Sequence, residues 1–263
     1  MHFKPVLIFC MLLSVACNNT ATSYNNKLNS NQTTVKSSTD KNPYHSISAI
    51  PLPDSFVRIK ADSNSFTNWL RNISLKENKT VYLFNGNAKA NQLAQFAVLD
   101  ISVGNKDLQQ CADAVMRLRA EYLFATKRFD EIIFTDNEKG IYTFEQPYSK
   151  EHFTKFMERV FGMCGSASLA KQLKPVSNFI NIQPGDVLIR GGFPGHAAIV
   201  LDVAINKDGK KIFILAQSYM PAQDIHVLLN PANDNLTPWY EVNDDDKIIT
   251  PEYLFYRNEL KCW

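Results

Sequence analysis

The sequence lacks a strong net charge of either sign, a second long apolar run and any pair of closely spaced cysteines. Lysine and arginine number 28 and aspartate and glutamate 26, so the formal net charge is only +2. A balance this close to zero provides no field for holding nucleic acid, and we expect no nucleic-acid partner. Ten glycines and twelve prolines in 263 residues are too few for a low-complexity chain. With 45% apolar residues, the composition predicts a folded, nearly neutral protein.

The first seventeen residues are typical of a targeting segment. Lys4 provides a positive start, residues 6–15 are apolar, and Ala16 and Cys17 follow. The apolar run is shorter than the about 20 residues that span a bilayer, so we predict a cleaved signal peptide over residues 1–16. A small residue directly before a cysteine resembles the bacterial lipobox, which implies that Cys17 carries a lipid. Ordinary secretion, with Cys17 merely close to the cleavage site, is the alternative.

A polar segment follows the predicted lipid site. Seven of residues 18–42 are asparagine and nine are serine or threonine, which leaves almost nothing apolar to bury. We therefore predict that residues 17–46 form a lipidated, disordered tether and that residues 47–263 form a single domain. The expected location is the bacterial cell envelope, with the lipid in the membrane and the domain facing the periplasm or the cell surface.

Three cysteines remain after the signal and the lipid site, namely Cys111, Cys164 and Cys262. They lie too far apart in sequence for a Cys-x-x-Cys motif, and the histidines have no His-x-x-x-His spacing, so we expect no metal and no cofactor. If Cys111 works as a thiol, only Cys164 and Cys262 are left to form an intramolecular disulfide bond.

The hydrophobic pattern predicts an α+β domain in which N-terminal helices precede an antiparallel β-meander. Helical spacing of apolar residues occurs over residues 63–74, from Asp107 onward, and over residues 149–163 and 166–173. From residue 185 the pattern changes to strands. Residues 196–205 are apolar on both faces, so this strand should be central in the sheet.

Cys111 is a candidate nucleophile because of its position at the start of a helix. Asp107 is a good N-cap, and Gln110 completes the pattern of a capping box. The unpaired N–H groups of a first helical turn favour an anion, which would lower the pKa of a thiol there. The alternative is a core cysteine, because Cys111 shares a helical face with Val115, Leu118 and Tyr122.

His196 opens a predicted strand behind the glycine-rich loop of residues 191–195. Gly195 before it and the small Ala197 after it should leave room for a substrate beside the ring. Gln109, or Gln110 if it is not used in the cap, could place a side-chain amide near the thiol as an oxyanion donor, with the N–H of Cys111.

A cysteine at a helix start followed by GDV and GHAAIV, at residues 185–187 and 195–200, resembles the NlpC-type and CHAP-type papain-like cysteine hydrolases. This resemblance covers about residues 107–219. It implies a papain-like fold, no cofactor, and a thiol-dependent hydrolase or transferase acting on amides, with peptidoglycan peptides as the favoured substrate. Over its whole length the chain also resembles an uncharacterised family of bacterial lipoproteins, through LQQCADAVMRLRAEYL, GGFPGHAAIV and LAQSYMPAQDIH.

Papain-like sites orient their histidine with a polar residue on the following strand. If residues 206–209 form a four-residue hairpin loop, Ile205 pairs with Lys210 and His196 lies opposite Tyr219. Gln217 is then the diagonal neighbour of His196 on the same face, about 7 Å away. We predict that Cys111 attacks, that His196 activates it, and that Gln217 orients His196, with Tyr219 as the rival. The alternative function is a non-catalytic binding or scaffold module on the same fold.

Overall fold

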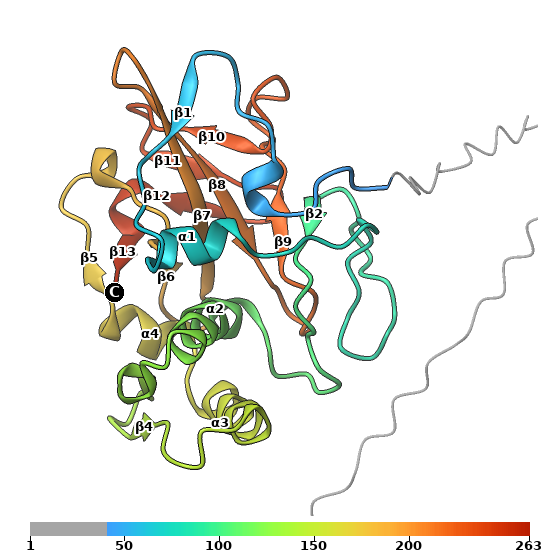
Figure 1. Ribbon diagram of the computed structural model, residues 1–263, viewed down its shortest axis with the longest axis vertical. Helices are drawn as coiled ribbons and strands as arrows, with labels where there is room; N and C mark the ends of the chain where they lie inside the picture. The colour runs from blue at the N-terminus through green and yellow to red at the C-terminus, as the bar shows by residue number, and fades with distance from the viewer. Residues whose placement is uncertain (1–40) are drawn as a thin grey trace, which may run out of the picture. The chain divides into compact units, whose positions relative to one another are not determined.

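The computed structural model describes residues 41–263, which form one compact unit. Its architecture is dominated by an antiparallel sheet of nine strands (Figure 1). The helices are α1 (Phe66–Arg71), α2 (Cys111–Ala125), α3 (Lys150–Met163) and α4 (Ser166–Gln172). The sheet strands are β1 (Phe56–Arg58), β2 (Gln95–Val98), β5 (Lys174–Pro175), β6 (Val187–Arg190), β7 (His196–Asn206), β8 (Lys211–Gln217), β9 (His226–Leu228), β10 (Trp239–Glu241) and β13 (Leu260–Cys262). Two hairpins, β3 (Ile133–Thr135) with β4 (Ile141–Thr143) and β11 (Lys247–Ile249) with β12 (Leu254–Tyr256), complete the fold.

The sheet joins strands that are far apart in the sequence. Its main order is β2-β9-β8-β7-β6-β13-β5, while β1 pairs with β7 and β10 with β8. Strand β7 is the longest, and all but its last two residues are buried. The prediction that this apolar segment lies centrally in the sheet is therefore confirmed.

Each face of the sheet packs against its own hydrophobic cluster. Ala197 and Ile199 of β7 join the hydrophobic cluster that includes residues of α1 and α2, and both helices pack on β7. Figure 1 shows α1 lying across the strands. Ala198 and Val200 point to the opposite layer, where they join Phe213 and other buried apolar side chains. A strand buried on both faces explains why its sequence shows no alternation of apolar and polar residues.

The predicted papain-like α+β fold, with N-terminal helices followed by a β-meander, is wrong. Among the α-helices of residues 41–263, only the six-residue α1 precedes α2, and the strands β1 and β2 also lie before it. These early strands pair with β7 and β9, more than 125 residues later, so they belong to the one large sheet. The local spacing of apolar residues predicted the late strands and the helices α3 and α4. It contains no information on which strands pair when they are more than 125 residues apart.

The predicted signal peptide, residues 1–16, and the lipid site Cys17 lie outside the described residues. The last part of the predicted tether, residues 41–46, belongs to the fold. Asn42 is buried, and its side chain donates hydrogen bonds to the carbonyl oxygens of Tyr44 and Lys76. Of the helices in residues 41–263, none has both the length and the apolar character needed to cross a bilayer.

Candidate functional site

The hairpin of β7 and β8 brings His196 and Gln217 together. Its strand register differs from the predicted one at two places, and the two differences compensate each other. Next to the turn, Ile205 pairs with Lys211 rather than with Lys210. A β-bulge between Val200 and Asp202 then takes up one residue, so that Ile199 pairs with Ala216 as predicted. At the far end, His196 Nε2 lies 2.7 Å from Gln217 Oε1.

Both members of this hydrogen bond are deeply buried, with 2% of His196 and 1% of Gln217 exposed. Three aromatic rings surround the imidazole, with centroid distances of 4.6 Å to Tyr219, 4.7 Å to Tyr253 and 5.7 Å to Phe255. Tyr219 therefore packs against the ring, while Gln217 makes the polar contact. Of the two candidates for orienting His196, the structure places Gln217 in hydrogen-bonding position.

Helix α2 begins at Cys111, three residues later than a helix capped at Asp107 would begin. Gln110 is the N-cap residue, and its backbone N–H donates to Asp113 Oδ2 at 3.0 Å. Asp107 serves the loop instead, because its Oδ1 accepts from the N–H of Ala222 at 2.7 Å. The later start places Cys111 at the first helical position, the position closest to the unpaired N–H groups of the helix.

The Cys111 sulfur lies against the strand that carries His196. The backbone N–H groups of Ala197, the residue after His196, of Ala112 and of Cys111 itself act to lower the pKa of this thiol. Burial and, secondarily, the charge of Asp113 nevertheless raise the pKa of the thiol. The predicted lowering of the thiol pKa is therefore wrong, because the helix start is covered: only 7% of Cys111 is exposed.

His196 is suited to act as a neutral base. Burial lowers its pKa to about 4, although the hydrogen bond to Gln217 and the charge of Glu252 act in the opposite direction. At neutral pH the site therefore holds an uncharged imidazole and an uncharged thiol, rather than an ion pair. Proton transfer from sulfur to the ring would then accompany attack on a substrate.

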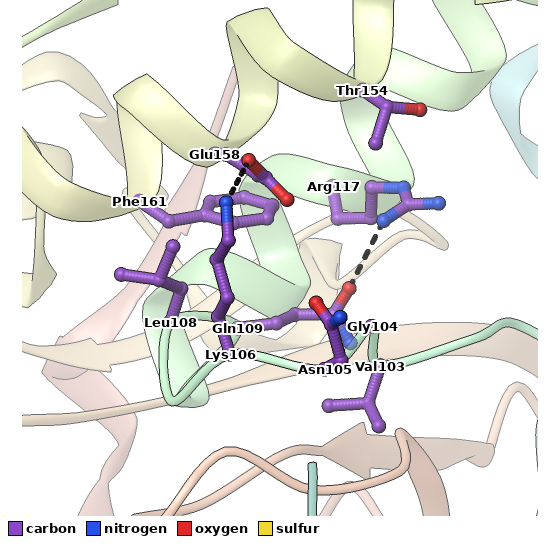
Figure 2. Close-up of a pocket in the computed structure, with 10 residues that line it drawn as sticks. All are labelled: Val103, Gly104, Asn105, Lys106, Leu108, Gln109, Arg117, Thr154, Glu158 and Phe161. Carbon is purple, nitrogen blue, oxygen red and sulfur yellow. Dashed lines mark hydrogen bonds and ion pairs between the residues drawn. The ribbon is translucent and has the colours of Figure 1, made fainter. Parts of the chain in front are cut away.

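Of the glutamines predicted as oxyanion donors, Gln110 has another partner, while the buried Nε2 of Gln109 has no hydrogen-bond partner but lies away from the thiol. The Gln110 side chain donates to Asp107 Oδ1 at 3.2 Å. Gln109 lies in a small cavity of about 40 Å³, where its Oε1 accepts from Arg117 Nη1 at 3.2 Å (Figure 2). Cys111 is not among the residues that line this cavity. The backbone N–H groups at the start of α2 are therefore the better oxyanion donors.

Gly195 has a different role from the predicted one. A Cβ atom there would lie 2.2 Å from Ser166 Oγ and 2.7 Å from the carbonyl oxygen of Arg190. The space beside this glycine is therefore filled by α4 and β6, and it is not available to a substrate. Gly195 is needed so that the start of α4 can approach the loop before β7.

Sequence reasoning missed the carboxylate that extends the hydrogen-bond chain. Glu252 Oε2 accepts from Gln217 Nε2 at 3.0 Å and from Lys89 Nζ at 2.6 Å, and Glu252 Oε1 accepts from Asn91 Nδ2 at 2.9 Å. A buried histidine, His226, pairs with Gln217 across β8 and β9. These residues come from three separate segments, and no local pattern in the sequence links them.

Cys164 and Cys262 are both free thiols. The predicted disulfide bond between them is therefore wrong. Within residues 41–263, no three histidine, cysteine, aspartate or glutamate side chains are grouped so that they could hold a metal ion.

Comparison with known proteins identifies a family. Residues 47–146 and 135–262 match the family model described as Domain of unknown function (4846). The predicted resemblance to an uncharacterised family is confirmed at this level, and the match does not extend to the NlpC-type or CHAP-type hydrolases. No curated protein and no solved structure matches the chain.

Proposed function

We propose that this chain, which belongs to the family described as Domain of unknown function (4846), is a thiol-dependent amide hydrolase or transferase. The observation that supports the proposal is the 2.7 Å hydrogen bond between His196 and Gln217, formed beside a cysteine at a helix start. The Ala197 N–H, which contacts the Cys111 sulfur, connects the two halves of the site. A buried histidine with one ring nitrogen fixed by a neutral amide is suited to accept a proton at its other nitrogen.

The reaction follows from the roles of these groups. The Cys111 sulfur forms a bond to the carbonyl carbon of the amide while His196 accepts the thiol proton. When the tetrahedral intermediate collapses, the C–N bond breaks and His196 returns that proton to the departing amine. Water, or a second amine in a transferase, then attacks the thioester and regenerates the thiol. Backbone N–H groups at the start of α2 stabilise the negative oxygen of both tetrahedral intermediates.

The proposed substrate class is the peptide part of peptidoglycan, and the proposed location is the bacterial cell envelope. The support for this location is the apolar run that ends at Ala16 and Cys17 in the sequence. Membrane fractionation of cells that express wild-type protein or Cys17→Ala tests the lipid anchor. Wild type should sediment with membranes and Cys17→Ala should be released, and a wild-type mature N-terminus without lipid in mass spectrometry would refute the anchor.

The activity is tested with purified residues 41–263 and a mixture of peptidoglycan peptides, with amide cleavage followed by mass spectrometry. Cys111→Ala should abolish turnover. Cys164→Ala is the matched control, because Cys164 has the same 7% exposure and lies at the end of α3. If Cys111→Ala retained the wild-type rate, the hydrolase proposal would be wrong.

A non-catalytic binding module is the second candidate, and the small exposure and raised pKa of Cys111 favour it. Such a module would bind peptidoglycan fragments without cleaving them. Cosedimentation with insoluble peptidoglycan distinguishes the two: a binding module gives retention of both wild type and Cys111→Ala, with no product from either.

A further inference from the structure

The hydrogen-bond chain that starts at His196 ends in a group that can only accept hydrogen bonds. His196 Nε2 contacts Gln217 Oε1, and Gln217 Nε2 contacts Glu252 Oε2. The Glu252 side chain is 15% exposed, and its Oε2 lies 2.6 Å from the ammonium group of Lys89. An ionised carboxylate has no proton to donate, so it can bond a side-chain amide only through the amide nitrogen.

The direction of the amide decides which nitrogen of His196 carries the proton. Because the nitrogen of Gln217 faces Glu252, its oxygen faces His196 Nε2, which must therefore be the N–H side of the ring. The other nitrogen, Nδ1, is then left with a free electron pair. With the amide reversed, the Gln217 nitrogen would donate to Nε2, and the proton would occupy Nδ1 instead.

We propose that Glu252 is a positioning residue that fixes the tautomer of His196 through the direction of the Gln217 amide. This inference rests on the proposed function in so far as it assigns the purpose of that tautomer, which is to keep Nδ1 available as the base for Cys111. Lys89 Nζ donates to the same Oε2 that accepts from Gln217, and Asn91 Nδ2 donates to Oε1, so both oxygens of the Glu252 carboxylate are held in place.

Among the described residues, no polar group other than Gln217 hydrogen-bonds the His196 ring, and the buried Nε2 of His226 has no hydrogen-bond partner. Arg190, which pairs with His196 across β6 and β7, donates to both carboxylate oxygens of Glu259 and to the hydroxyl of Tyr253. His226, opposite Gln217, contacts the carbonyl oxygen of Asp224 through Nδ1. Tyr219 and Tyr253 contribute ring faces, and Cys111 lies beyond Ala197. Among the hydrogen bonds of the described residues, the bond that sets the amide of Gln217 is the one to Glu252.

The test is ¹⁵N NMR of the histidine side chains at pH 8 in residues 41–263, comparing wild type, Glu252→Gln and Lys89→Met. Wild type should show His196 with a protonated Nε2 and an unprotonated Nδ1. Glu252→Gln replaces the acceptor with an amide that can also donate, so the Nδ1 resonance should shift toward its protonated value. Lys89→Met breaks the same ion pair but keeps the carboxylate, so the His196 tautomer should stay as in wild type.

These variants distinguish an effect of Glu252 on the direction of the Gln217 amide from a purely structural role of the Lys89–Glu252 ion pair. A structural role for the ion pair would make Glu252→Gln and Lys89→Met behave alike. A wild-type His196 with its proton on Nδ1, or a Glu252→Gln protein that keeps the pure Nε2–H tautomer, would overturn the inference. The wild-type spectrum alone tests the tautomer if a variant fails to fold.

A kinetic measurement connects the tautomer to the thiol. Glu252→Gln should slow iodoacetamide labelling of Cys111 by roughly 10-fold, because part of the population lacks a base at Nδ1. Glu121→Gln is the control, since Glu121 is 14% exposed and is also paired with cations, on α2. Equal rates for Glu252→Gln and wild type would contradict the inference. If the protein hydrolyses no peptide but the His196 tautomer still responds to Glu252→Gln, the proposed function is refuted and the inference about Glu252 stands.

Discussion

Cys111 and Cys164 are alike in the two properties that are most often used to judge a thiol. Each is 7% exposed. Burial is the largest influence on both, it raises the pKa of both, and for Cys164 the value reaches about 12. The charge of the buried Asp113 raises the pKa of both thiols as well. Exposure and the direction of the pKa shift therefore do not identify a reactive cysteine in this protein.

The two thiols differ in the end of the helix at which they lie. Cys111 begins α2, and the backbone N–H groups of Ala112, Cys111 itself and Ala197 of β7 lower its pKa against the effect of burial. Cys164 follows the last residue of α3, the end at which helix carbonyl groups point outward, and Asp136 adds to the negative surroundings. Helix polarity favours negative charge on sulfur at the first position and opposes it at the second.

The largest expected difference between these thiols is in alkylation. A substoichiometric active-site-directed electrophile at pH 8 should label Cys111 at least about 100-fold faster than Cys164, because backbone N–H groups favour a thiolate at Cys111 and, in the proposed function, His196 accepts its proton. Peptide mapping of wild type, Cys111→Ala and Cys164→Ala measures this ratio. Label that persists in Cys111→Ala and disappears in Cys164→Ala would reverse the comparison.

The second expected effect concerns the base. His196→Ala should slow alkylation of Cys111 by about 10- to 100-fold, because no group then accepts the thiol proton. His226→Gln is the matched control, since His226 is fully buried on the same sheet and burial lowers its pKa to about 4 as well. An equal loss in both variants would mean that the effect comes from disturbed packing of the sheet.

The sequence contains enough information to identify the parts of the site that are local. Cys111 at a helix start and His196 at a strand start follow from capping and periodicity. The proximity of His196 and Gln217 was predicted from a hairpin in which the assumed pairing next to the turn differs by one residue from the observed pairing. It is nevertheless confirmed, because the bulge after Val200 compensates for that difference.

The parts that could not be predicted depend on long-range packing. Lys89 and Glu252 are 163 residues apart and form an ion pair, with Glu252 in the loop between β11 and β12. The raised pKa of Cys111 depends on how deeply α2 is covered, which a helical pattern does not reveal. The fold class was wrong for the same reason, since the pairing of β1 and β2 with late strands has no local signal.

The third prediction uses pH to test whether the base is neutral. The pKa of His196 is about 4 in the folded protein, below the ordinary value of 6.5, so the unfolded chain binds more protons between these values. The stability that His196 contributes is complete above pH 6.5 and is lost as the pH falls toward 4. The stability difference between wild type and His196→Gln should therefore shift against wild type by about 2 kcal/mol from pH 7 to 4.5.

Urea unfolding of both proteins at the two pH values measures this change. The pKa values of Asp186, about 7, and of Asp113 are raised by burial, so these groups contribute with the opposite sign. Both proteins contain them, and their contributions cancel in the comparison. An unchanged difference between pH 7 and 4.5 would mean that His196 keeps its ordinary pKa in the folded protein.

The fourth prediction removes the charge that the two thiols share. Asp113→Asn keeps an oxygen that can accept from the Gln110 N–H, but it eliminates the carboxylate. Alkylation of Cys111 should become faster, because the carboxylate of Asp113 is one of the causes that raise the pKa of its thiol. Cys164 should remain unreactive, since burial is the largest cause of its raised pKa. Slower alkylation of Cys111 would show that Asp113 acts mainly by capping α2.

The smallest expected effect is that of removing the third cysteine. Cys262 is half-buried in β13 and free, so Cys262→Ser should change the free energy of unfolding by less than about 0.5 kcal/mol. A disulfide bond to Cys164 would close a loop of roughly 100 residues and would contribute about 4–5 kcal/mol. Urea unfolding of wild type and Cys262→Ser, each with and without reductant, distinguishes these cases. A large loss of unfolding free energy in Cys262→Ser, which wild type shows only under reducing conditions, would mean that Cys164 is paired with Cys262. The low reactivity of Cys164 would then be explained by the disulfide bond and not by its position at a helix end.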